Sequence, residues 1–279
     1  MWFGTRAFMR EVRDPDISPT YESVAWGEST QYLNGGLGVS SSATAHREYY
    51  LSWSGVTRAQ VREVTDFADG VYGTGLIYWL DPVAMDQNVL PQSWATPALG
   101  GRDAIPLAGT VRPTLAAQSD QTQGYPTETA IFSMVSGVTP VRPLFIPVPT
   151  GYVAWVGVHG ANANNFVKVT PYTGTTAGTP VYPAILSVST TTRVNTSFSS
   201  VTGIELVMNN AATGSPELTG LIVQILPTGA TPATGGFISG QGHSGCRFIG
   251  RPTVVPETVA SGLEVLSVTA KLGEVGAWE

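Results

Sequence analysis

The sequence predicts a mainly β chain divided into two domains, and three observations lead to this fold class. Glycine and proline are abundant, with 32 and 20 copies among 279 residues, which is typical of turn-rich β structure. One segment, residues 57–69, carries the spacing of an amphipathic helix. Between residues 125 and 227, short apolar runs recur with turn residues between them, as in a β-sandwich.

The helix prediction rests on two end signals and one apolar face. Thr57 and Gln60 have the spacing of a capping box, in which a hydroxyl and an amide satisfy free backbone amides at a helix start. Apolar side chains then follow at helical spacing: Val61, Val64, Phe67 and Ala68. Gly70 suits the left-handed residue that ends a helix. The flanking runs 46–53 and 75–80 are predicted strands, so the helix is expected to cover the apolar face of a sheet.

The middle of the chain is predicted to form an inserted sandwich domain, residues 121–236. Its expected strands are residues 144–147, 152–158, 166–172, 181–188, 193–198, 204–208 and 220–226. Seven or eight short strands at this spacing are typical of a sandwich or jelly roll.

The last strand is predicted to return the chain to its first domain. Apolar and other residues alternate from position 266 to 273, and one face carries Leu266, Val268, Ala270 and Leu272. A long alternating strand near a chain end normally completes an existing sheet. We therefore expect residues 1–120 and 237–279 to form one helix-bearing β domain.

The charge pattern limits the possible partners. Charged residues make up only 12% of the chain, about half the share in ordinary globular proteins. Twelve of the 14 basic residues are arginines, the exceptions being Lys168 and Lys271. Interface cores favour arginine over lysine and are poor in charge, so burial against other subunits is one explanation. The net charge of −6 and the absence of basic clusters make nucleic acid an unexpected partner.

Targeting signals are missing from the first residues. They lack the charged lead and apolar core of a secretory signal, and no apolar run approaches membrane-spanning length. Cys246 is the single cysteine, so no intrachain disulfide is expected. These features favour folding in a reducing cytoplasm, without membrane contact.

The polar residues do not predict an enzyme, a cofactor or a metal site. His46, His159 and His243 are scattered, and no metal-ligand spacing is present. Cys246 lacks the flanking pattern of a nucleophile and is expected to be a buried apolar residue. Residues 240–245 match G-x-G-x-x-G, but a strand-like segment follows instead of a helix, so an interdomain loop is predicted.

Several short segments resemble one family, the distal tail proteins that long-tailed phages of actinobacteria encode as minor tail proteins. The resemblance is carried by Leu33-Asn34-Gly35-Gly36, His46-Arg47-Glu48-Tyr49, Gly75-Leu76-Ile77-Tyr78-Trp79-Leu80-Asp81-Pro82, Leu90-Pro91-Gln92-Ser93-Trp94, Gly242-His243-Ser244-Gly245-Cys246-Arg247-Phe248 and Val275-Gly276-Ala277-Trp278-Glu279. The resemblance covers most of the chain, and its motifs mark turns and strand ends rather than catalytic chemistry.

The resemblance implies a non-enzymatic virion protein. Members of the family form a hexameric ring at the tail tip, in which a β domain with one helix builds the ring. A galectin-like or carbohydrate-binding-module-like sandwich projects outward. The implied partners are other copies of the chain, the tail tube protein, and the tape measure and tip proteins. The implied location is the phage tail tip, after assembly in the host cytoplasm.

Two sets of residues are candidate contact sites. Trp155, Tyr172 and Tyr182 are candidates for stacking on host cell-wall glycan, although aromatic residues also dominate sandwich cores. The segment 84–101 is a candidate arm that reaches a neighbouring subunit, and an ordinary surface loop is the alternative. Its candidate interface residues are Val89, Leu90, Trp94 and Leu99.

Two other functions remain open from the sequence. One is a carbohydrate-binding adhesion protein that recognises the host surface. The other is a glycan hydrolase with an appended sandwich, which needs two facing carboxylates that the sequence does not suggest.

Overall fold

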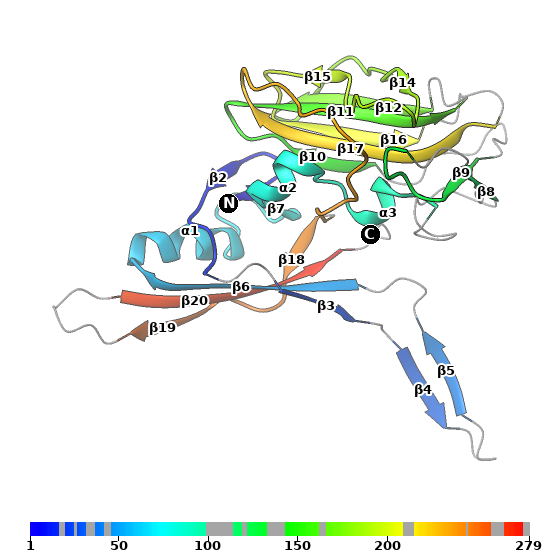
Figure 1. Ribbon diagram of the computed structural model, residues 1–279. Helices are drawn as coiled ribbons and strands as arrows, with labels where there is room; N and C mark the ends of the chain where they lie inside the picture. The colour runs from blue at the N-terminus through cyan, green and yellow to red at the C-terminus, as the bar shows by residue number, and fades with distance from the viewer. Residues whose placement is uncertain are drawn as a thin grey trace. The chain divides into compact units, whose positions relative to one another are not determined.

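The computed structural model describes residues 1–16, 20–24, 27–31, 37–41, 46–98, 114–118, 122–132, 143–161, 166–208, 215–243, 245–257 and 265–275. Across these residues the protein is mainly β and contains several sheets (Figure 1). The chain divides into two compact units. Unit 1 comprises Met1–Glu11 and Tyr78–Ser244, and unit 2 comprises Val12–Ile77 and Gly245–Glu279.

Unit 2 is built around a long antiparallel pair, β6 (His46–Val56) and β20 (Val265–Glu274). The strands beside this pair are β3 (Thr20–Val24) next to β6, and β18 (Cys246–Phe248) and β19 (Thr253–Glu257) next to β20. A separate two-stranded sheet consists of β4 (Gly27–Gln31) and β5 (Leu37–Ser41).

The predicted alternation of the last strand is confirmed. Leu266, Val268, Ala270 and Leu272 are buried, and the residues between them are more exposed. In the register with β6, Val268 lies opposite Trp53, Ala270 opposite Leu51 and Leu272 opposite Tyr49. All three partners are buried, so the two strands present one continuous apolar face.

The predicted helix is α1 (Arg58–Ala68), and its capping box is confirmed. The hydroxyl of Thr57 accepts a bond from the Gln60 backbone amide at 3.3 Å, and the Gln60 side chain accepts from the Thr57 amide at 2.9 Å. Gly70 has φ +75°, the left-handed conformation expected just beyond a helix end. The buried face, with Val61, Val64 and Phe67, accounts for the packing of the helix beside β20.

Unit 1 contains two sheets that share one hydrophobic core. The four-stranded sheet has the order β10 (Leu144–Pro147), β16 (Gly203–Met208), β12 (Val167–Thr173) and β13 (Thr176–Ala177). The six-stranded sheet has the order β14 (Ile185–Leu186), β11 (Tyr152–Ala161), β17 (Glu217–Pro227), β9 (Glu128–Ile131) and β8 (Thr114–Ala117), with β15 (Thr196–Phe198) also pairing with β11. Val156, Ile204, Leu206 and Val223 are among the fully buried side chains between the sheets.

Two short helices complete unit 1, α2 (Pro82–Gln87) and α3 (Gln92–Ala95). Asn88, fully buried between them, makes four hydrogen bonds, and two of these hold this segment against β17. Its Nδ2 donates to the carbonyl oxygens of Leu221 at 3.0 Å and Ile238 at 2.9 Å. Its Oδ1 accepts from the backbone amides of Val223 at 3.1 Å and Leu90 at 3.3 Å. This one amide satisfies backbone groups that would otherwise lack partners.

The chain start also belongs to unit 1. β1 (Trp2–Thr5) and β2 (Met9–Glu11) form an antiparallel hairpin, and β1 also neighbours β7 (Ile77–Leu80). This hairpin, α2 and α3 all belong to unit 1. The division between the units therefore lies at other positions than the sequence predicted. The observed crossings follow residues 11, 77 and 244, whereas the sequence predicted crossings after residues 120 and 236. Residues 120 and 121 lie outside the described ranges.

Candidate functional site

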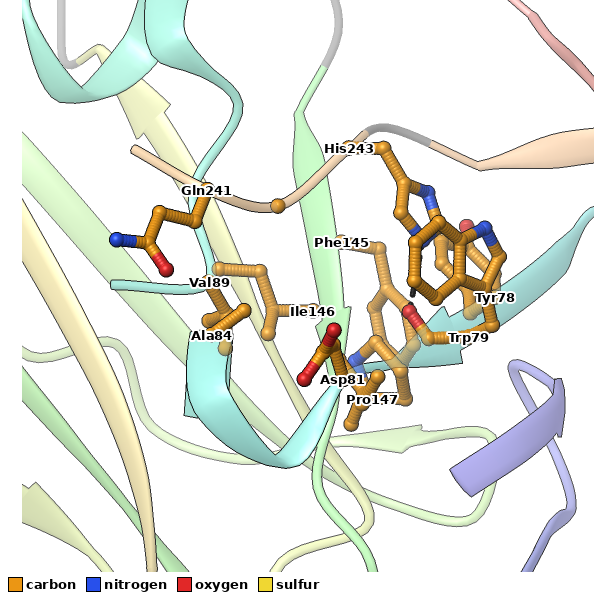
Figure 2. A pocket seen from close by; sticks show the side chains of 12 residues that line it. Tyr78, Trp79, Asp81, Ala84, Val89, Phe145, Ile146, Pro147, Gln241 and His243 are labelled. Atoms are coloured by element: carbon orange, nitrogen blue, oxygen red, sulfur yellow. Dashed lines mark hydrogen bonds between the residues drawn. The ribbon is translucent and has the colours of Figure 1, made fainter. Parts of the chain in front are cut away.

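A hollow in unit 1 is a candidate binding site (Figure 2). The cavity volume is about 20 Å³, which is room for one water molecule. Three segments line it: residues 78–81 with Ala84 and Val89, residues 145–147 of β10, and residues 241–243. The lining is mostly apolar and aromatic.

One wall of the hollow is a stacked pair of rings. The rings of Trp79 and His243 have centroids 4.4 Å apart and planes inclined by 26°. The Nε2 atom of His243 is 2.7 Å from the carbonyl oxygen of Trp79. Because a carbonyl oxygen can only accept, Nε2 carries the proton and donates it. The imidazole therefore has a structural bond that fixes its orientation against the indole.

Besides His243, the lining carries the polar side chains of Asp81 and Gln241. Figure 2 shows the Asp81 carboxylate between Ala84 and Phe145. One of its oxygens accepts a hydrogen bond from the Val83 amide at 2.7 Å and so caps α2.

The Tyr172 candidate lies on the outer face of the four-stranded sheet, in a cluster with Arg6, Phe145 and Glu205. The guanidinium carbon of Arg6 is 4.4 Å from the ring centroids of both Phe145 and Tyr172. An Arg6 nitrogen lies 3.1 Å from a Glu205 oxygen, and the Tyr172 hydroxyl donates to the same oxygen at 3.4 Å. The face of Tyr172 that a sugar ring would need therefore carries an arginine of the same chain.

Trp155 and Tyr182 do not join Tyr172 in one site. Trp155 is partly buried and pairs across β11 and β17 with Gln224. Its strand neighbours Ala154 and Val156 point into the core, so Trp155 lies on the outer face of the six-stranded sheet. Tyr172 belongs to the other, four-stranded sheet. Tyr182 is 42% exposed beside β12. The three aromatic residues therefore do not form one sugar-binding surface.

The candidate interface residues lie inside unit 1. The side chains of Val89, Leu90 and Trp94 belong to the hydrophobic core and are between 0% and 6% exposed. Because Asn88 and the two short helices hold this segment against β17, these three residues present no free surface to a second copy. Leu99, the fourth candidate, lies outside the described residues.

Sequence reasoning missed a buried polar cluster around His159. The Tyr125 hydroxyl lies 2.6 Å from Nδ1 of His159, and Nε2 lies 2.7 Å from the carbonyl oxygen of Arg193. Nε2 must donate to that carbonyl, so Nδ1 accepts from the tyrosine. Arg193 in turn donates from Nε to the carbonyl of Gly236 at 2.8 Å. This chain of bonds ties the segment after β17 to the outer face of β11.

Burial sets the protonation of this cluster. It lowers the pKa of His159 to about 4 and raises the pKa of Tyr125 above its ordinary value. The sequence did indicate the direction of the His159 side chain. Val156 and Val158 alternate towards the core, so the next residue of the strand, His159, faces the other side. Its partners could not be predicted, since they come from distant segments.

Cys246 is fully buried, as predicted, and burial raises the pKa of its thiol. Within the described ranges, no group of three or more histidine, cysteine, aspartate or glutamate side chains is placed to hold a metal ion. No helix in the described part of the chain is both long enough and apolar enough to cross a membrane.

Comparisons of the chain with protein families, with curated proteins and with solved structures gave no match.

Proposed function

We propose that the protein is a structural component of a phage tail tip, a distal tail protein that forms a hexameric ring. Unit 2, which carries the helix α1, would build the ring, and the two sheets of unit 1 would be the projecting galectin-like or jelly-roll module. The ring would join the tail tube protein to the tape measure and tip proteins. The protein would act mechanically, without catalysis or a cofactor.

One observation carries this proposal, the open edge of the unit 2 sheet. All five residues of β19 are exposed, including Val254 at 39% and Val255 at 51%. Among the described strands, β19 pairs with β20 alone. Soluble proteins usually protect such edges, because the free backbone groups and apolar side chains invite pairing with another chain. A ring closed by head-to-tail contacts would cover this edge in every copy.

The resemblance of the sequence segments supplies the phage context, and the low charge agrees with extensive burial between subunits. The glycan-binding alternative is favoured by the 42% exposure of Tyr182 alone. The hydrolase alternative gains nothing from the hollow, where Asp81 is the one carboxylate among the described lining residues.

The test is the native mass of the purified full chain and of two lysine variants. We expect the wild-type protein to be a hexamer with a ring visible by electron microscopy. Val255→Lys places a charge on the open edge and should give monomers. Val71→Lys is the matched control, because Val71 is 63% exposed in a turn, and it should leave the ring intact. A wild-type protein that stays monomeric at tens of micromolar would refute the proposed ring. A hexameric Val255→Lys variant would show that β19 is not part of the contact between subunits.

A further inference from the structure

The outer face of the six-stranded sheet in unit 1 carries a second layer of buried side chains. In β11 and β17, the residues that alternate with the core positions turn to this face. Those with apolar side chains are between 0% and 8% exposed, namely Val153, Ile222 and Leu226. Trp155 and Gln224 stand among them, so a polar atom that either residue buries is surrounded by apolar groups.

Trp155 and Gln224 are direct neighbours across this strand pair. In the antiparallel register of β11 and β17, their Cα atoms lie opposite each other. Residues paired in this way turn their side chains to the same face, with Cβ atoms about 4.5–5.5 Å apart. Trp155 is partly exposed, whereas Gln224 is completely buried. The indole and the amide therefore lie close enough to share one small bound molecule.

The hydrogen bond of the Gln224 amide nitrogen sets the direction of the amide oxygen. Nε2 donates to the carbonyl oxygen of Asp86 at 2.6 Å. The segment after Asp86 follows the edge of β17 that faces away from β11, where the Val89 amide donates to the Val223 carbonyl oxygen at 2.9 Å. Because the nitrogen and oxygen of an amide point in different directions, Oε1 is left on the side of β11 and Trp155.

Two complementary atoms on this face lack hydrogen bonds. Within the described part of the chain, neither Nε1 of Trp155 nor Oε1 of Gln224 has a hydrogen-bond partner, and both atoms are buried. The indole nitrogen can only donate, and the amide oxygen can only accept. A buried polar atom without a partner is costly, and a polar contact too long for a direct bond is often bridged by water.

We propose that Trp155 and Gln224 bind one enclosed water molecule between β11 and β17. The water accepts a hydrogen bond from Nε1 of Trp155 and donates one to Oε1 of Gln224. Water suits the pair because it both accepts and donates, and buried waters usually satisfy polar groups of this kind. Since both atoms are closed off from solvent, a larger hydroxyl ligand cannot reach them in this structure.

The bridge has a consequence for Trp155 as a candidate glycan contact. It holds the indole with its N–H group turned towards Gln224 and the interior of the layer. The exposed part of Trp155 then offers a sugar only ring carbons and no hydrogen-bond donor. This inference concerns a single chain and does not depend on the proposed ring.

The test is water contact at the tryptophan indoles, measured by NMR on the full-length protein. The protein is deuterated and labelled with ¹⁵N at the indoles, and Trp155→Phe and Trp53→Phe assign the two signals needed. We expect a direct dipolar cross-peak between water and the Trp155 indole proton. The matched control is Trp53, which is 3% exposed and donates from Nε1 to the Arg13 carbonyl oxygen at 2.8 Å, and it should show none. A Trp155 indole without the cross-peak, or equal cross-peaks at both indoles, would overturn the proposal.

Two variants test whether Gln224 holds the water. Gln224→Met has a similar length but no oxygen, so the cross-peak at Trp155 should be lost while the other indole signals keep their positions. Ser197→Ala is the matched control, because Ser197 is the exposed neighbour of Trp155 on the other side, in β15, and it should leave the cross-peak unchanged. A cross-peak that survives Gln224→Met, or one that disappears in Ser197→Ala, contradicts the bridge.

A crystal structure of the wild-type chain decides the question even if Gln224→Met does not fold. It should show a water molecule within about 2.7–3.2 Å of both Nε1 of Trp155 and Oε1 of Gln224. A direct bond between these two atoms would overturn the proposal, because the pair would then need no water.

Discussion

Single side chains with several partners hold unit 1 together where regular pairing ends. Asn88 bonds to four backbone groups from three segments, and His159 joins Tyr125 to the carbonyl of Arg193. Both residues are completely buried. Since a buried polar group without a partner costs roughly 1–3 kcal/mol, such residues tolerate few replacements. The contact of Arg6 with Glu205 differs, because the arginine keeps 44% of its side chain exposed.

His159 makes the stability of unit 1 depend on pH. In the unfolded chain its pKa is about 6.5, and burial lowers it to about 4 in the folded protein. The unfolded chain therefore binds the proton first on acidification. The stability from this group is complete above about pH 6.5 and is lost as the pH falls towards 4, by about 3 kcal/mol.

The measurement is urea unfolding of the wild-type protein and of His159→Gln at several pH values between 7 and 4. Glutamine keeps a donor and an acceptor but does not titrate in this range. We expect the free energy of unfolding to fall more steeply in the wild-type protein than in the variant. Parallel curves would show that His159 does not titrate across this window.

At the scale of elements, sequence patterns predicted the helix and strands whose formation depends on residues close together in the chain. The helix α1 follows from its capping box and its 3.6-residue spacing, and β20 follows from strict alternation. The predicted ends of β10 and β16 also agree with the structure to within one residue. The helices α2 and α3 were missed because they are short, and their stability comes from packing on β17.

The segment from Gly240 to Gly242 shows how a local pattern can mislead. Its glycines match a nucleotide-binding motif by letter, but they serve close packing of one backbone on another. A Cβ at Gly240 would lie 2.4 Å from the Leu90 carbonyl oxygen, and one at Gly242 would lie 1.8 Å from the Val89 carbonyl oxygen. The requirement for glycine was visible in the sequence, but the partner segment, 88–90, lies about 150 positions earlier and could not be inferred.

Gly242→Ala should therefore destabilise unit 1. The added methyl group overlaps a backbone atom that is held by β17, so the free energy of unfolding should fall by about 1–3 kcal/mol. Gly75→Ala is the matched control, because nothing lies within 4 Å of its added Cβ, and its effect should stay within about 0.5 kcal/mol. Urea unfolding followed by tryptophan fluorescence compares the two. Equal stability of the two variants would mean that residue 242 shifts away without cost.

At the scale of the whole molecule, the chain crosses between its units three times, after residues 11, 77 and 244. Sequence reasoning expected the early and late residues to meet in one domain, and β6 and β20 do pair. The positions of the crossings were not predictable, because the hairpin 1–11 and the segment 78–98 carry no composition that distinguishes unit 1 from unit 2. Their assignment depends on long-range contacts such as those of Arg6 and Asn88.

Because each unit has its own buried apolar side chains, we expect two unfolding transitions in calorimetry of the Val255→Lys protein. Asn88→Ala strands buried backbone groups and should lower the transition of unit 1, by roughly 2–4 °C for each kcal/mol lost. Thr57→Ala removes the cap of α1, worth about 1 kcal/mol, and should lower the transition of unit 2 alone. The double variant should show both shifts undiminished, since the two sites share no partner. A single transition that both substitutions move would mean that the units unfold as one cooperative body.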